Sequence, residues 1–178
     1  MNYEFEFLCL DKISEDIFKS FYSILKASLP AVEFRSEQNQ RNLTKKRVYE
    51  LLVCKENGKV IGAIAFWHLE DFIFIEHFVI DENFRSKGIG TKMLETIKNH
   101  FNSTVILEVE LPYNEMNKRR IAFYERNGFY YNDFEYFQVP LNTGDEPLPL
   151  KIMSCPKSIS KDEFESVRNA LKKAVYSS

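Results

Sequence analysis

FRSKGIGTKMLETI, residues 84 to 97, carries two glycines and two cations directly before a helix-like pattern. A helix N-terminus exposes unpaired N–H groups and a partial positive charge, so it attracts anions. Gly88 and Gly90 remove side chains that would keep a phosphate away from those amides, while Arg85 and Lys87 add positive charge. The stretch predicts a phosphate-binding helix N-terminus, and a simple strand-to-helix turn is the alternative. The spacing excludes a P-loop and a dinucleotide-binding fingerprint.

The elements around this stretch indicate a mixed sheet. Before it, residues 72–80 are apolar on both faces, as in a central strand. Residues 48–69 form two apolar runs around Asn57-Gly58, which favours a hairpin with a type I′ turn. The other predicted strands are residues 3–7, 104–110, 129–139 and 148–153, and the other predicted helices are 14–29, 116–127 and 161–175. The polar segment 31–46 is compatible with a short exposed helix or a loop.

Composition indicates an ordinary globular chain of 178 residues with a formal charge of −2. This charge argues against a general nucleic-acid binder. Three widely spaced cysteines without a CxxC pair favour free thiols in a reducing compartment. The N-terminal residues lack a signal-peptide pattern, and no apolar run is long enough to span a membrane, so we expect a cytoplasmic protein. The histidines show no metal-ligand spacing, so we expect no metal site.

Two motifs carry a family resemblance. VIDENFRSKGIG, residues 79–90, resembles the acyl-CoA-binding motif of the GCN5-related N-acetyltransferase (GNAT) superfamily, in which Arg-x-x-Gly-x-Gly wraps a pyrophosphate. NKRRIAFYERNGF, residues 117–129, resembles the second signature helix of that superfamily. Ala122 directly precedes Phe123, which departs from the commonest alanine register, whereas the Phe-Tyr and Gly-Phe pairs are intact.

The resemblance implies an α/β fold with a mixed, mostly antiparallel central sheet of about seven strands and helices on both faces. The central strands that carry Glu76 and Val105 are expected to splay apart. It also implies an acetyltransferase domain over residues 1–155, followed by an amphipathic C-terminal helix, residues 156–178, packed on the same domain.

The resemblance further implies acetyl-CoA as the co-substrate. The backbone of the strand end would pair with pantetheine, the amides of the turn would bind the pyrophosphate, and two residues of the later helix would contact the coenzyme. The implied coenzyme-binding residues are Phe78, Val79, Ile80, Arg85, Ser86, Lys87, Gly88, Ile89, Gly90, Thr91, Asn117 and Tyr124.

Acetyl transfer to an amine needs a neutral amine, oxyanion stabilisation and a proton for the leaving thiolate. Glu76 is the candidate base, because a carboxylate among apolar strand residues should have a raised pKa. The alternative is a carboxylate at the rim that orients the substrate. Tyr124 matches the family tyrosine that protonates the thiolate, and a core aromatic is its alternative. His77 is expected on the opposite strand face as a structural histidine.

The predicted function is direct transfer of an acetyl group from acetyl-CoA to a primary amine of a small molecule or a peptide. A non-catalytic acyl-CoA-binding or regulatory module is one alternative. An acetyltransferase acting on charged tRNA is another, and the acidic charge balance disfavours it. We expect no nucleic-acid or membrane partner and a monomer or homodimer. The segment around residues 33–42 and the late strands would shape the acceptor pocket.

Overall fold

The structure is a computed structural model that describes residues 2–177. The chain forms two compact units. The first unit comprises Met1–His68 and Ile75–Asn102, and the second comprises Leu69–Phe74 and Ser103–Ser178. Both units contain strands and helices.

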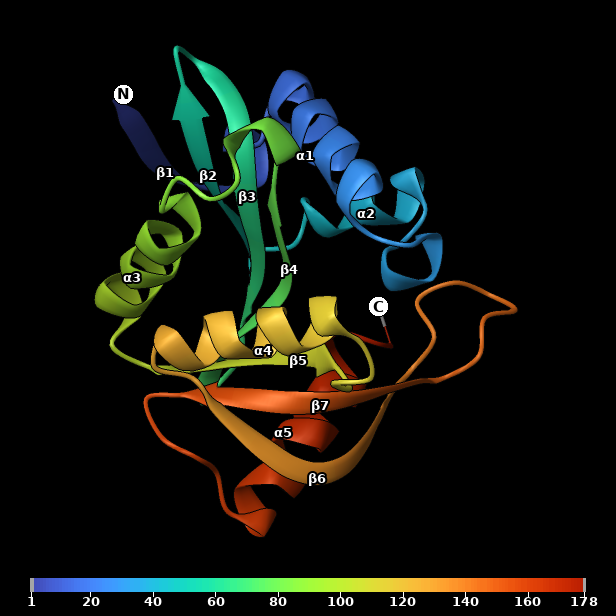
Figure 1. Ribbon diagram of the computed structural model, residues 1–178. Coiled ribbons are helices and arrows are strands. Elements are labelled where there is room, and N and C mark those ends of the chain that lie inside the picture. The colour runs from blue at the N-terminus through green and yellow to red at the C-terminus, as the bar shows by residue number, and fades with distance from the viewer. Residues whose placement is uncertain (1, 178) are drawn as a thin grey trace. The chain divides into compact units, whose positions relative to one another are not determined.

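The first unit contains four strands and three α-helices (Figure 1). In chain order they are β1 Tyr3–Cys9, α1 Glu15–Ser28, α2 Glu37–Leu43, β2 Tyr49–Glu56, β3 Lys59–His68, β4 Phe72–Ile80, of which the first three residues belong to the second unit, and α3 Ile89–Phe101. Strands β1, β2 and β3 are antiparallel neighbours, and β4 follows β3 in the strand order. Asn57 and Gly58 have φ angles of 50° and 77°, so the predicted turn with two positive φ angles is confirmed.

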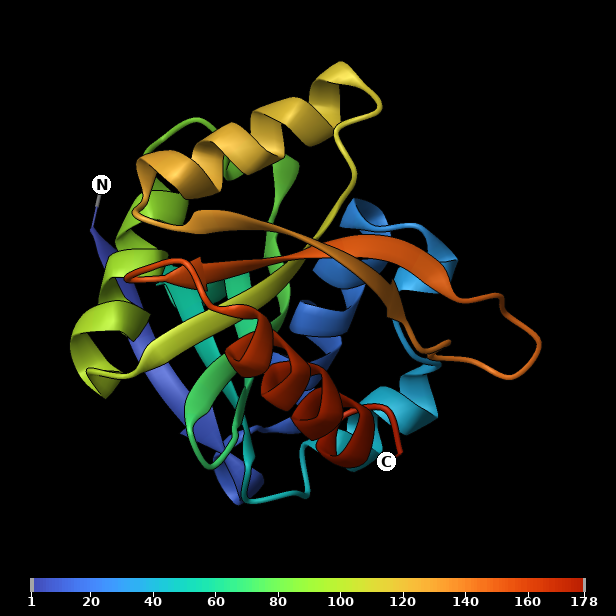
Figure 2. The same cartoon turned by 90° about the horizontal axis from the view of Figure 1, so that it is seen from below.

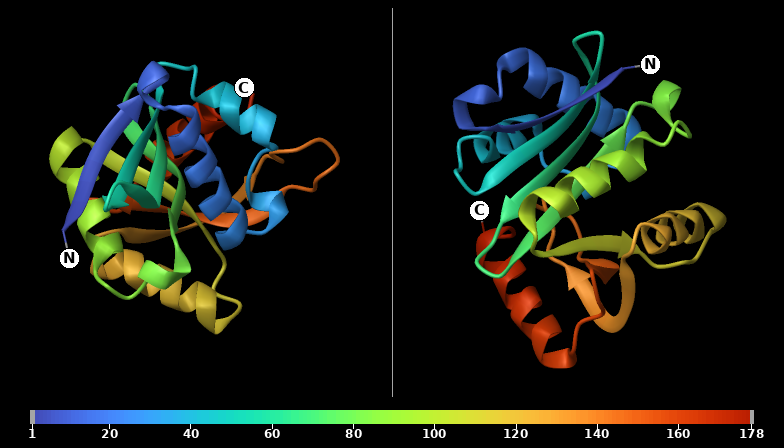
Figure 3. Two further views of the ribbon diagram at one scale, coloured as in Figure 1. Left: turned by 90° about the horizontal axis from the view of Figure 1, so that it is seen from above. Right: turned by 90° about the vertical axis from the view of Figure 1, so that its left-hand side faces the viewer.

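Helices α1 and α3 cover opposite faces of β1–β3, as the right-hand view of Figure 3 shows. Two consecutive residues of β3 illustrate this division. Phe66 contacts Phe101 of α3 at a ring separation of 5.4 Å, whereas Trp67 packs edge-on against Tyr49 at 5.3 Å on the other face. Successive side chains of β3 therefore point to opposite faces of the sheet and contribute to the core on each side.

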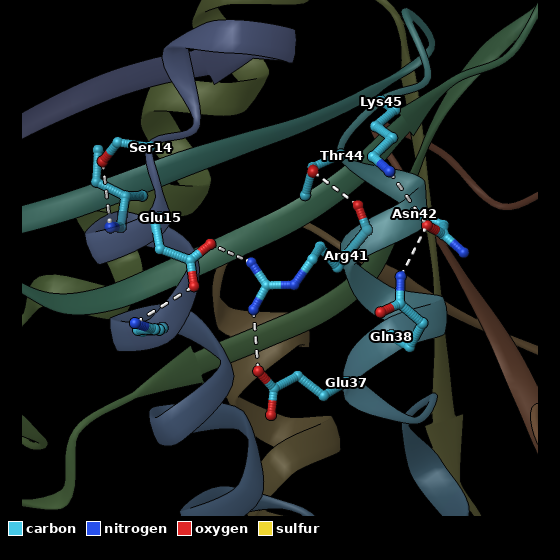
Figure 4. Close-up of polar contacts among 10 residues, drawn as sticks. Ser14, Glu15, Glu37, Gln38, Arg41, Asn42, Thr44 and Lys45 are labelled. Atoms are coloured by element: carbon cyan, nitrogen blue, oxygen red, sulfur yellow. Dashed lines mark hydrogen bonds and ion pairs between the residues drawn. The ribbon is translucent and has the colours of Figure 1, made fainter.

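Helix α2 lies beside α1 and is tied to it by polar contacts (Figure 4). The Arg41 guanidinium bonds to Glu15 of α1 and lies 3.0 Å from Glu37, and its carbon stands 4.1 Å from the Phe18 ring centroid. The structure resolves the ambiguity of segment 31–46 in favour of a short helix. One side of that helix is buried, because its Gln40 is inaccessible to solvent.

The second unit contains three antiparallel strands and two helices. They are β5 Thr104–Glu110, α4 Glu115–Arg126, β6 Tyr130–Gln138, β7 Leu148–Cys155 and α5 Lys161–Ala174, with the strand order β5-β7-β6. Helices α4 and α5 lie on opposite faces of these strands (Figure 2). Phe164 of α5 stacks on Phe134 of β6 at 4.6 Å, and the Tyr176 hydroxyl donates to Glu108 of β5 at 2.7 Å.

The fold-class prediction is confirmed: seven mostly antiparallel strands carry helices on both faces in each unit. The expected splay between the strands of Glu76 and Val105 involves both units and stays a prediction, as does the domain boundary at residue 155. Among the described residues, no helix combines the length and apolarity needed to cross a membrane.

Candidate functional site

The N-terminus of α3 differs from that of every other α-helix in residues 2–177. The other four begin with a side-chain cap and an acidic residue in the first turn; the capping residues are Ser14, Ser36, Asn114 and Ser160. Helix α3 begins at Gly88, which provides no side-chain cap, and its first turn contains no acid. Its first amides therefore face no competing carboxylate or hydroxyl, which is the donor set that an anion needs.

The backbone before α3 is shaped by two residues with positive φ angles. Ser86 has φ 61° and Gly88 has φ 76°. A Cβ atom added to Gly88 would meet no atom within 4 Å, so the space over this turn is open. Residues 85–88 are exposed, whereas Ile89 and Gly90, the first two residues of α3, are buried. Thr91 is half-buried.

The two cations of this turn are held in different ways. Arg85 donates from Nε to the Ile80 carbonyl at 3.0 Å and from Nη2 to Ser28 Oγ at 3.1 Å. Lys87 Nζ lies 4.7 Å from the centroid of the Phe84 ring. Arg85 therefore braces the turn against the end of β4 and α1, while Lys87 stays at the surface.

The residues present at this turn fit a diphosphate, because exposed residues, an open glycine and two cations precede an uncapped helix end. The strand end predicted to pair with pantetheine lies directly before it. Phe78 and Ile80 are half-buried and Val79 is buried. The structure therefore brings the predicted residues 78–80 and 85–91 together within the first unit.

Glu76 lies on β4 in the same unit, and its carboxylate forms an ion pair with Arg35. The Glu76 and Arg35 side chains are only 3% and 4% exposed. Nothing in the local sequence around Arg35 signalled this contact, because the two residues are 41 positions apart. Arg35 is the functional candidate that sequence reasoning missed.

This pairing corrects the expected pKa of Glu76. Burial alone raises the pKa of the carboxyl, as predicted from its apolar neighbours. The charge of Arg35 and its hydrogen bond to the carboxylate outweigh burial, so the net pKa is lowered. Arg35 dominates this lowering, because its guanidinium contacts the carboxylate directly. The prediction of a raised pKa was wrong, and Glu76 is ionised at neutral pH.

His77 also meets Glu76, contrary to the simple alternation of a strand. Its Nε2 lies 3.7 Å from Glu76 Oε2, and its side chain is buried. Burial lowers the pKa of His77 to about 4, although Glu76 opposes this effect. The imidazole is therefore neutral at neutral pH, and its contact with Glu76 is not an ion pair.

Tyr49 completes the surroundings of Glu76 from β2. Gln40 Nε2 of α2 donates to the Tyr49 hydroxyl at 2.6 Å. Burial and the Glu76 charge raise the pKa of Tyr49 well above its ordinary value, so it keeps its proton. Glu76 is thus enclosed by one cation and by neutral polar groups.

The remaining predicted residues belong to α4 in the second unit. Asn117 is buried, and its Nδ2 donates to the Leu111 carbonyl at 3.0 Å. Its Oδ1 is buried and has no hydrogen-bond partner among the described residues. Asn117 thus ties the start of α4 to the end of β5, and its predicted coenzyme contact stays a prediction.

Tyr124 is 8% exposed and packs edge-on against Phe123 and Phe129, at ring separations of 5.4 and 5.6 Å. Burial raises the pKa of Tyr124 to about 12, although the Arg120 charge opposes the shift. The phenol therefore carries its proton across the physiological range, which is the state that a proton donor needs. The role of Tyr124 as a catalytic acid stays a prediction.

No cluster of three or more His, Cys, Asp or Glu residues within residues 2–177 has the arrangement to hold a metal ion.

Comparison with known proteins places these features in a family. The sequence model of the Acetyltransferase (GNAT) family matches residues 14–129, more than half of the 178 residues. "Putative acetyltransferase YjbC" from Bacillus subtilis (strain 168) is 29% identical over 115 residues, which cover 62% of this chain and 56% of that protein. The match thus spans little more than half the length of this relative.

Solved structures share the fold. "Putative acetyltransferase from GNAT family from Bacteroides thetaiotaomicron" has a TM-score of 0.89 at 29% identity, covering 97% of this chain and 99% of that chain. The ribosomal-protein-S18-alanine N-acetyltransferase from Escherichia coli has a TM-score of 0.64 at 20% identity, covering 89% and 97%. A GNAT family acetyltransferase from Elizabethkingia anophelis with acetyl-CoA bound has a TM-score of 0.58 at 16% identity, covering 86% and 97%. The last two show likeness of fold alone.

Proposed function

Because this chain belongs to the acetyltransferase (GNAT) family, we propose that it transfers an acetyl group from acetyl-CoA directly to a primary amine of a small molecule or a peptide. The observation that carries the proposal is the uncapped start of α3, where the exposed residues 85–88 precede the helix and Gly88 leaves open space. A related fold from Elizabethkingia anophelis holds acetyl-CoA, which supports the same ligand here.

In this proposal the turn at residues 85–91 binds the pyrophosphate, and the backbone of residues 78–80 pairs with the pantetheine arm. Asn117 and Tyr124 contact the coenzyme from α4. When bound, acetyl-CoA supplies an activated thioester. A backbone N–H at or near Val79 stabilises the negative charge that develops on the carbonyl oxygen.

Two side chains move the protons. Glu76 accepts the proton that the amine nitrogen loses as it bonds to the acetyl carbon, directly or through water. Tyr124 donates its phenolic proton to the sulfur as the carbon–sulfur bond breaks. Exchange with solvent restores both groups. The lowered pKa of Glu76 keeps the carboxylate ionised at neutral pH. It also makes Glu76 a weak base toward an alkylammonium with a pKa of about 10, so in this proposal Glu76 takes its proton only as the nitrogen bonds to the acetyl carbon.

Release of free thiol from acetyl-CoA tests this proposal against a panel of amino acids, polyamines, aminoglycosides and peptide N-termini. We expect turnover with at least one class of amine. Tyr124→Phe should lower kcat by about 10²-fold or more and raise the Kd for coenzyme A much less, because the donated proton acts mainly in the transition state. Phe123→Leu, at the neighbouring position, is the packing control. Equal losses of kcat in both variants would remove Tyr124 from the chemistry.

A second candidate function rests on the closed surroundings of Glu76. The carboxylate is already paired with Arg35 and is almost inaccessible to solvent, which favours a non-catalytic acyl-CoA-binding module. Tight binding of acetyl-CoA without thiol release across the whole amine panel would support this alternative.

A further inference from the structure

The ion pair between Arg35 and Glu76 is built into the first unit and is not a surface contact. Both side chains are more than nine-tenths buried, and burial of two charges is costly unless their geometry is well satisfied. Apolar residues flank Glu76 in the sheet, so an apolar side chain at this position would pack there without the cost of burying a charge. A buried pair in this place therefore calls for a role other than stability.

The backbone around Arg35 is held from both sides. The Tyr22 hydroxyl of α1 donates to the Arg35 carbonyl at 3.3 Å, and the Phe34 ring packs edge-on against Tyr22 at 5.9 Å. Ser36 then caps α2 by accepting from the Asn39 amide. The segment between the short 3₁₀ turn Ala31–Glu33 and α2 is thus fixed, and it aims the Arg35 side chain at β4.

Groups from four elements face Glu76. Besides Arg35 before α2, these are Tyr49 on β2, Trp67 on β3 and His77 on β4. Tyr49 keeps its proton, His77 is neutral at neutral pH and the Trp67 indole does not titrate. Arg35 is consequently the single permanent charge among these groups, and it is the group that decides the charge state of Glu76.

We propose that Arg35 is a positioning residue for the acetyl-transfer reaction: its guanidinium fixes the orientation and the charge of the Glu76 carboxylate. This inference rests on the proposed function and deepens it. Arg35 touches neither the coenzyme nor the amine in this scheme and acts through Glu76. This role of Arg35 explains how a buried carboxylate can still act in catalysis. The ion pair keeps Glu76 ionised, whereas burial alone would favour its protonated form.

The first test measures the pH dependence of kcat/KM for Arg35→Met, which is uncharged and similar in length. Burial would then act on Glu76 without an opposing cation, so the acidic limb of the profile should move up by about one pH unit or more. Arg35→Lys should restore most of the original profile, because it restores the charge. The Kd for coenzyme A should stay unchanged, because the start of α3 is intact.

Arg41→Met is the matched control. Arg41 also forms ion pairs in the first unit, with Glu15 and Glu37 (Figure 4), but the carboxylates that it pairs with are more than half exposed, so its removal leaves no buried charge. Its pH profile should coincide with that of the unmodified protein. If Arg35→Met fails to fold, Arg35→Gln takes its place under the same criterion, since it removes the charge and keeps a hydrogen-bond donor.

A second measurement separates this inference from the proposed function. Titration of ¹³C-labelled glutamate carboxyls by NMR, with Glu76→Gln to assign the signal, reports Glu76 without any turnover. The midpoint of the Glu76 signal should lie higher in Arg35→Met than in the unmodified protein. An unchanged midpoint and an unchanged acidic limb would overturn the role of Arg35. A shifted midpoint in a protein that acetylates no amine would instead refute the proposed function.

Discussion

The start of α3 and the surroundings of Glu76 both belong to the first unit, but their charged and polar groups are arranged in opposite ways. Directly before α3, residues 85–88 are exposed, the helix has no side-chain cap and the space over Gly88 is open. Around Glu76 the charge is buried and already neutralised by Arg35. The first arrangement suits a ligand that arrives with its own negative charge, whereas the second suits a group that must keep a fixed charge state.

This difference has an energetic consequence. An open anion site costs the free protein little, because water occupies the exposed turn until a ligand replaces it. A buried ion pair makes stability depend on both partners at once, because either one alone leaves an uncompensated charge. The two regions should therefore respond to mutation in different observables: ligand affinity at α3, and folding stability and pH dependence at Glu76.

The largest expected effect is the loss of stability in Arg35→Met. Removal of one partner of a buried pair should lower the free energy of unfolding by about 3–5 kcal/mol, because Glu76 is left buried and charged. Urea denaturation followed by circular dichroism measures this loss. Arg35→Met combined with Glu76→Gln should recover part of it, since no unpaired charge remains. Arg41→Met should lose only about 1 kcal/mol, because the glutamates that it leaves unpaired are exposed to water.

A smaller effect is expected from the pH dependence of stability. The pKa of Glu76 is lowered in the folded protein, so its ionised form stabilises the fold above the ordinary carboxyl pKa of 4.5, and this contribution is lost as the pH falls through the folded pKa. Glu76→Gln lacks the titration. The difference in unfolding free energy between the unmodified protein and Glu76→Gln should be largest near pH 7 and should shrink below pH 4.5. A difference that stays constant across this range would contradict the lowered pKa.

Local signals made most of the fold predictable from sequence. Asn57-Gly58 fixed the hairpin turn, Ser14 marked the start of α1, and Gly128 with φ 85° ended the segment after α4 as expected. Each of these signals acts over a few residues, where backbone geometry and capping chemistry decide the outcome. The polar segment before β2 stayed ambiguous, because burial of Gln40 depends on distant strands.

The candidate site likewise has one part that local sequence predicts and one part that it does not. The glycines and cations at α3 are adjacent in sequence, so their shared role could be predicted. The partner of Glu76 could not, since Arg35 comes from a distant polar stretch. The wrong pKa for Glu76 followed from reading its strand neighbours alone, and the contact with His77 was missed because alternation was applied residue by residue.

Substitution of Gly88 offers a test with a close internal control. Gly88 and Gly58 have φ angles of 76° and 77°, and a Cβ atom would meet no atom within 4 Å at either. Gly88→Ala and Gly58→Ala should therefore each destabilise the protein by about 1 kcal/mol through backbone strain. Only Gly88→Ala should weaken coenzyme A binding, by about tenfold, in isothermal titration calorimetry. Equal affinities for coenzyme A in the two variants would argue that Gly88 serves only the geometry of the turn and not ligand binding.

The smallest expected effect concerns Lys87, whose ammonium lies over the Phe84 ring at the surface beside the α3 start. Lys87→Ala should weaken coenzyme A binding by about two- to fivefold, because an exposed charge near a helix end contributes about 0.3–1 kcal/mol. The loss should fade as salt is raised, since screening removes the same interaction in the unmodified protein. Lys59→Ala, an exposed lysine beside the hairpin turn, controls for net charge and should leave the affinity unchanged. If both lysines contribute equally to the affinity, the attraction comes from the overall charge of the protein and not from the α3 turn. The α3 turn would then not be a local anion site, and it would no longer differ from the Glu76 region in the way it handles charge.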